Sequence, residues 1–189
     1  EMPSGKVVVD ISWGANLETG KFVEIKKWEE KTNYYNPEFN FIEDNTIIDG
    51  EFQDERYFSH RLNEVDKWLK VEPIDIPDDT CAIGFRGGEF AVYPDLFLTK
   101  DYWVEAMNFM RNNVNANIRF RIVTDDPQLA QSLFPHIEVT HDVAMDWRQV
   151  RHARYSIIAN SAFYILPRWL KHFEEEKWDE DVLTVLPRR

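Results

Sequence analysis

The residues Cys81-Ala82-Ile83-Gly84-Phe85 form a short apolar run, which Arg86-Gly87-Gly88 brings to an end. A run of this length bounded by glycine is typical of a buried strand. From this run onward, apolar segments of strand length alternate with segments of helical periodicity. This alternation predicts an α/β fold with a parallel sheet.

Helix-start residues support the alternation. Thr99 precedes segment 100–113, whose apolar residues recur at helical spacing, and Asp126 followed by Pro127 is typical of the start of a helix that reaches Phe134. We expect strands at 81–85, 120–124, 137–140 and 155–159, with further helices opened by Asp146 and by Asn160-Ser161. Each strand is therefore expected to lead directly into a helix.

The chain before this region is less regular. We expect strands at 6–11 and 47–50, and a helix over 59–70 whose apolar face includes Trp68 and turns into the core. Stretch 71–80 contains two prolines and four acidic residues without periodicity, which is typical of a linker. The chain is therefore predicted to have an N-terminal lobe at 1–72 and a second domain at 73–189 with an acidic tail.

The composition excludes several classes of protein. The 189 residues carry a formal net charge of −12, which argues against a nucleic-acid partner because such proteins neutralise phosphates with a basic surface. The single cysteine, Cys81, excludes an intramolecular disulfide. No apolar run is long enough for a membrane span, and residues 1–6 contain no signal-peptide core. These features predict a soluble cytoplasmic protein.

Polar residues follow three of the expected strands. They are Arg86-Gly87-Gly88-Glu89, Thr124-Asp125-Asp126 and Asn160-Ser161-Ala162-Phe163. Parallel sheets bind ligands beyond the carboxyl ends of their strands, where helix N-termini, glycine backbone and arginine favour phosphate. Together these corners predict a pocket for a nucleotide or nucleotide sugar.

A plainer interpretation of the same residues has about equal weight. Arg86 can be a surface arginine paired with Glu89, Asp126 can be a helix cap alone, and Asn160-Ser161 can cap a helix without any ligand. The spacing leaves both interpretations open.

The same corners resemble motifs of the alpha-1,2-fucosyltransferase family (glycosyltransferase family 11). Residues 84–89 are similar to its HxRxGD motif, 123–126 to FSDD, and 160–166 to NSTFSWW. Stretches 9–13 and 49–58 also resemble the family, and all five stand in the family's order. Gly84 replaces the motif histidine, Glu89 replaces the aspartate, and the family's glycine-rich GGLGNQ loop has no counterpart. We therefore expect either that the given chain lacks this opening or that the protein is a diverged relative.

This resemblance implies a GT-B-like fold, with a partial acceptor-side lobe at 1–72 and a Rossmann-type donor-binding domain at 73–189. It implies an inverting glycosyltransferase that transfers fucose from GDP-fucose to a hydroxyl of a carbohydrate acceptor, without a metal or other cofactor. Arg86 and Glu89 are the expected catalytic residues. The expected donor contacts are Arg86, Gly87, Gly88, Asp125, Asp126, Asn160, Ser161 and Phe163.

Other interpretations remain open at this point. The chain can be an inactive nucleotide- or glycan-binding module of the same fold, or a structural acidic interaction domain. Segment 179–181 has the spacing of a metal-binding DxD motif, but it lies in an acidic run and is expected to be solvated. Arg148, Arg151 and Arg154 form a basic stripe, either a solvated face or a source of positive potential beside the diphosphate.

Overall fold

The computed structural model describes residues 13–15, 22–24, 26–32, 34–43, 46–52, 54–174 and 183–187. The chain divides into two compact units, Glu1–Arg61 and Leu62–Arg189. Helix α1 (Leu62–Trp68) and the proline-containing stretch after it therefore belong to the second unit. The strand expected at 6–11 and the DxD segment at 179–181 lie outside the described residues.

The described part of the first unit consists of short strands and 3₁₀ turns. Strands β1 (Trp13–Ala15) and β2 (Phe22–Glu24) pair antiparallel, β3 (Lys26–Glu29) and β4 (Thr46–Asp49) pair parallel, and the turns are η1 (Pro37–Phe41), η2 (Glu55–Tyr57) and η3 (Ser59–Arg61). Strand β4 confirms the strand expected before Gly50. Aromatic rings pack against one another in this unit, namely those of Trp28, Tyr35, Phe39, Phe52 and Tyr57.

The second unit is built on a five-stranded parallel sheet, so the α/β fold with a parallel sheet is confirmed. Its strands are β5 (Thr80–Phe85), β6 (Arg119–Thr124), β7 (Glu138–Thr140), β8 (Tyr155–Ile158) and β9 (Leu183–Val185). They lie in the order β7-β6-β5-β8-β9, and every neighbouring pair is parallel. The order turns back between β5 and β8, which is the point where sheets of this Rossmann-like type bind ligands.

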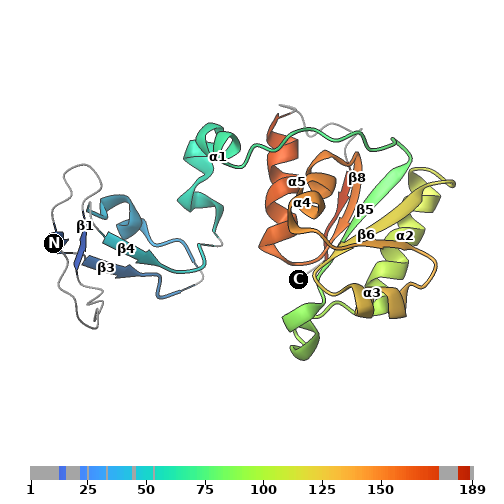
Figure 1. Cartoon of the computed structure of the whole chain (residues 1–189), viewed down its shortest axis with the longest axis horizontal. Coiled ribbons are helices and arrows are strands. Elements are labelled where there is room, and N and C mark those ends of the chain that lie inside the picture. The colour runs from blue at the N-terminus through green and yellow to red at the C-terminus, as the bar shows by residue number, and fades with distance from the viewer. Residues whose placement is uncertain are drawn as a thin grey trace, which may run out of the picture. The chain divides into compact units, whose positions relative to one another are not determined.

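Helices cover both faces of this sheet. They are α2 (Lys100–Asn113), α3 (Pro127–Leu133), α4 (Val143–His152) and α5 (Ala162–Glu174), and the turn η4 (Gly88–Val92) follows β5. Figure 1 shows α2 and α3 on one face and α4 and α5 on the other. All six residues of β5 are buried in consequence. No helix in the described part of the chain is both long and apolar enough to cross a membrane.

Helix α5 packs closely on the end of β5. A Cβ atom at Gly84 would lie 2.7 Å from the ring of Tyr164, which is closer than side chains tolerate. The Tyr164 hydroxyl lies 3.1 Å from the carbonyl oxygen of Phe85 and 3.3 Å from that of Val123, so the ring is fixed at both strands. Any side chain at position 84 would therefore overlap the Tyr164 ring, and the structure leaves no room there for the histidine of the HxRxGD motif.

Two expectations about helices are wrong. Helix α4 begins at Val143 rather than at Asp146, because the carboxylate of Asp142 caps it by accepting a hydrogen bond from the Met145 N–H at 2.8 Å. Trp68 is not in the core, since 72% of it is exposed. The apolar residues of α1 do recur at helical spacing, but no described residue covers Trp68 at the end of the helix.

Substitution of Gly84 by alanine tests the packing of α5 on β5. Gly84→Ala is expected to lower the free energy of unfolding by about 1–3 kcal/mol, because the added methyl group overlaps the fixed Tyr164 ring. Chemical denaturation measures the change. In a Tyr164→Ala background the same methyl group should cost clearly less, and an equal cost in both backgrounds would contradict the assignment.

Candidate functional site

The carboxylate of Asp125 joins the ends of β5 and β6. Its Oδ2 lies 2.7 Å from Nη1 of Arg86, and its Oδ1 accepts a hydrogen bond of 2.9 Å from the backbone N–H of Gly87. Both residues follow β5 directly, and Asp125 follows β6. The structure therefore brings the first two predicted corners into direct contact at the carboxyl edge of the sheet.

The two glycines are required by this contact. A Cβ atom at Gly87 would lie 2.6 Å from Cβ of Asp126. Gly88 has a φ of +39°, and a Cβ atom there would overlap the carboxylate of Asp125. The absence of a Cβ atom at Gly87 and Gly88 thus lets the backbone approach Asp125 and Asp126 closely.

Asp126 has the role of a helix cap. Its Oδ1 accepts a hydrogen bond of 3.0 Å from the N–H of Leu129, and its own N–H donates to Oγ1 of Thr124 at 2.9 Å. The predicted cap at the start of α3 is confirmed. The carboxylate stands at the candidate site, with one oxygen already engaged.

The third corner lies beside the end of β5. The N–H of Ala159 donates to the carbonyl oxygen of Gly84 at 2.9 Å, which holds the segment before α5 in place. Oδ1 of Asn160 is buried, and no described group donates a hydrogen bond to it. Ser161 is buried at the start of α5. Asn160 and Ser161 therefore meet the same sheet edge as Arg86, and Asn160 presents an unused acceptor.

Glu89 pairs with Arg86 from the solvent side. Its Oε1 lies 3.0 Å from Nη2 of Arg86, and its side chain is 67% exposed. The guanidinium also lies over the ring of Phe90, 5.3 Å from the centroid. The Arg86 guanidinium is thus paired with two carboxylates, those of Glu89 and Asp125. A further anion reaches Nη2 of Arg86 by replacing the exposed carboxylate of Glu89.

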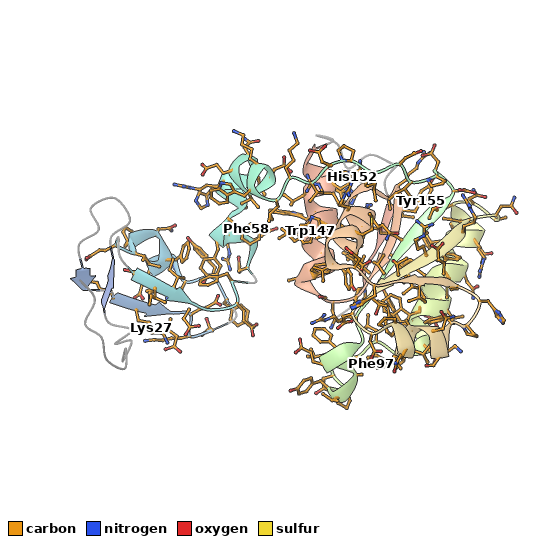
Figure 2. All side chains as sticks on the ribbon, viewed as in Figure 1. Lys27, Phe58, Phe97, Trp147, His152 and Tyr155 are labelled. Carbon is orange, nitrogen blue, oxygen red and sulfur yellow. The ribbon has the colours of Figure 1, made fainter. Side chains whose placement is uncertain are left out.

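Phe163 belongs to a different surface. Its ring packs edge-on against Trp147 of α4, with 5.5 Å between the centroids. Trp147 is labelled in Figure 2. Both rings line a groove of about 330 Å³, which we call the apolar groove. Its other lining residues include Trp68, Lys70, Val143 and Arg148. The structure therefore assigns Phe163 to the helical layer beside α1.

Two residues of the basic stripe, Arg148 and Arg151, lie on α4 and are engaged within the second unit. Arg151 is buried and forms an ion pair with Asp66 of α1, so it is not part of a solvated face. Arg148 donates from Nε and Nη2 to the carbonyl oxygens of Glu72 and Pro73, at 2.9 and 3.3 Å. These contacts fasten α1 and the stretch after it to α4.

Asp146 is a buried carboxyl that the sequence analysis placed only as a helix start. It is 3% exposed, and it accepts hydrogen bonds from Oγ1 of Thr140 at 3.3 Å and from the N–H of Asp142 at 3.2 Å. Burial raises its pKa from 3.8 to about 6. The neighbouring His141 donates from Nδ1 to the carbonyl oxygen of Thr124, directly before Asp125. The sequence feature that could have indicated the burial of Asp146 is the pair Asp142 and Asp146, because only one of two aspartates at a helix start is needed as its cap.

Replacement of Asp146 by asparagine tests this burial. The folded-state pKa of about 6 exceeds the unfolded value of 3.8, so ionisation of Asp146 destabilises the folded protein progressively as the pH rises through this interval. The stability of Asp146→Asn relative to wild type should therefore rise between pH 4 and pH 7, by at most about 3 kcal/mol.

Thermal unfolding across this pH range measures the difference. The comparison is repeated in a His141→Asn background, because His141 interacts electrostatically with Asp146. A stability difference that is the same at pH 4 and pH 7 would contradict the assignment of the raised pKa to Asp146.

Among the described residues, no group of three or more histidine, cysteine, aspartate or glutamate side chains is arranged to hold a metal ion. No family model matches the chain, and no curated protein matches it.

Proposed function

We propose that the second unit binds the diphosphate of a nucleotide sugar at the carboxyl ends of β5, β6 and β8. The protein is then an inverting glycosyltransferase of GT-B-like arrangement, which transfers fucose from GDP-fucose to a hydroxyl of a carbohydrate acceptor. The observation that carries the proposal is the place of Arg86, whose guanidinium follows β5 at the point where the strand order turns back.

The Arg86 guanidinium is oriented by Asp125 and offers Nη2 to an incoming anion. Asp125 holds Nη1 at 2.7 Å, while Nη2 meets only the exposed carboxylate of Glu89 among the described residues. A diphosphate oxygen replaces Glu89 at Nη2, and a charge-assisted hydrogen bond forms in place of a solvent-exposed ion pair. Asp125 thus acts as a positioning residue for the guanidinium.

The start of α5 supplies the second part of the site. This helix has 13 residues, and its first N–H groups lack partners within the helix, so its N-terminus favours negative charge. Oδ1 of Asn160 is an acceptor without a donor among the described groups, which suits a hydroxyl group of the nucleotide sugar.

The proposed reaction needs no metal. The acceptor hydroxyl attacks the anomeric carbon of the donor sugar, and the bond to the diphosphate breaks as GDP leaves. Arg86 and the N-terminus of α5 stabilise the charge that develops on the diphosphate. Glu89 accepts the proton of the attacking hydroxyl as general base.

A nucleotide-binding module without transfer activity is the second candidate. It is favoured by the packing at position 84, where the ring of Tyr164 lies in the space that a histidine of the HxRxGD motif would need. It is also favoured by the engagement of Asp125 and Asp126 in hydrogen bonds that hold the fold. In this candidate Arg86 still binds the diphosphate, but no sugar is transferred.

Substitution of Arg86 tests binding. Arg86→Ala is expected to weaken GDP binding by about 100-fold while the fold is retained, because a charge-assisted contact to the diphosphate is lost. Calorimetric titration with GDP measures the affinity. Arg119→Ala is the matched control, since Arg119 forms its ion pair with Asp79 at the other end of β6. Unchanged GDP affinity in Arg86→Ala would overturn the proposed site.

Substitution of Glu89 separates the two candidates. Glu89→Gln is expected to bind GDP more tightly, because a neutral amide competes less for Arg86, and to lose transfer because it cannot accept a proton. GDP release from GDP-fucose with an acceptor panel, in excess EDTA, measures transfer. Full activity of this variant would exclude Glu89 as the base. GDP binding by the wild type without turnover would favour the module.

A further inference from the structure

The apolar groove exposes large apolar side chains that the rest of the unit does not cover. Trp68 at the end of α1 is 72% exposed, and Val143 at the start of α4 is 69% exposed. Both line the groove together with the rings of Trp147 and Phe163. Exposed tryptophan beside a concave apolar surface is typical of a binding site.

The walls of the groove are fixed. The buried guanidinium of Arg151 pairs with Asp66, which holds α1 to α4. Arg148 donates two hydrogen bonds to the backbone of Glu72 and Pro73, so the chain after α1 is held as well. The groove is therefore largely formed before any ligand arrives, and ligand binding loses little energy in ordering it.

The charge of the groove is opposite to that of the chain. Lys70 and Arg148 line it, and no carboxylate does. Within the described residues neither side chain forms an ion pair, whereas carboxylates pair with Arg86, Arg119, Arg121 and Arg151. In a chain of net charge −12, two cations without carboxylate partners beside aromatic rings favour an anion.

We propose that the apolar groove binds a small organic anion with a flat apolar body. The body lies against Trp68, Trp147 and Phe163, and the anionic group lies beside Lys70 and Arg148. A volume of about 330 Å³ accommodates one ring system rather than a protein segment. This site lies outside the Arg86 corner, so the inference does not rest on the proposed function.

Three probes with the same ring test the proposal. 2-Naphthalenesulfonate, 2-naphthalenemethanol and 2-naphthylmethylammonium differ in charge, and their binding to the full chain is measured by calorimetric titration. The sulfonate is expected to bind with one-to-one stoichiometry and at least tenfold more tightly than the neutral and cationic probes. Equal binding of the three probes, or no binding of the sulfonate, overturns the proposal.

Substitutions locate the binding in the groove. Trp68→Ala and Lys70→Gln change exposed side chains, so both variants should fold, and each is expected to weaken sulfonate binding at least fivefold. Lys70→Gln should leave the affinity for the neutral probe unchanged. Phe109→Ala on α2 is the matched control for loss of an exposed aromatic ring. An effect of Phe109→Ala equal to that of Trp68→Ala overturns the location.

The Arg86→Ala variant keeps this test separate from the diphosphate site. It should bind 2-naphthalenesulfonate as the wild type does, whatever its affinity for GDP. Loss of sulfonate binding in Arg86→Ala would place the anion at the sheet edge and overturn the groove as its site.

Discussion

The contact between Tyr164 and Gly84 is the constraint on which the second unit depends. The ring of Tyr164 lies where a side chain at position 84 would stand, and its hydroxyl is bound to the ends of both β5 and β6. This contact fixes the start of α5 beside the residues that follow β5. Arg86, Asp125 and Asn160 meet at one edge because these strand ends and this helix start are held together.

The elements of the second unit could be predicted where the signal is local. The Asp126-Pro127 pair determines the start of α3 through a hydrogen bond within three residues, and the apolar run 81–85 is long enough to identify β5. Prediction failed where the deciding contact joins residues far apart in the sequence, or where two nearby residues could both have made it. Asp142 and Asp146 are both plausible caps for α4, and only the structure shows that Asp142 is the cap. Trp68 has the spacing of a core residue, but no described residue covers it. Strand β9 has only three residues, which form a strand by pairing with β8.

The location of the candidate site could be predicted from the sequence, but the contacts among its side chains could not. Parallel strands end at the same edge, so the sequence is sufficient to bring Arg86 and Asp125 together. The sequence does not show that Asp125 binds both Arg86 and the Gly87 N–H, because the position of the Asp125 side chain relative to Gly87, 38 residues earlier, is set by the fold. Nor does it show that the burial of Asp146 raises its pKa to about 6, since that shift comes from the packing around α4.

The two candidate anion sites differ in what an anion must displace. At the sheet edge the cation is shared by carboxylates, and a phosphate must exchange with Glu89. That exchange is feasible because Glu89 is mostly exposed, and exposed ion pairs contribute at most about 1 kcal/mol. In the apolar groove Lys70 and Arg148 have no carboxylate to give up among the described residues, and the aromatic rings add apolar burial. If both proposals hold, selectivity follows ligand shape: a compact polar diphosphate gains most from Arg86 and the start of α5, and a flat apolar anion gains most from the groove.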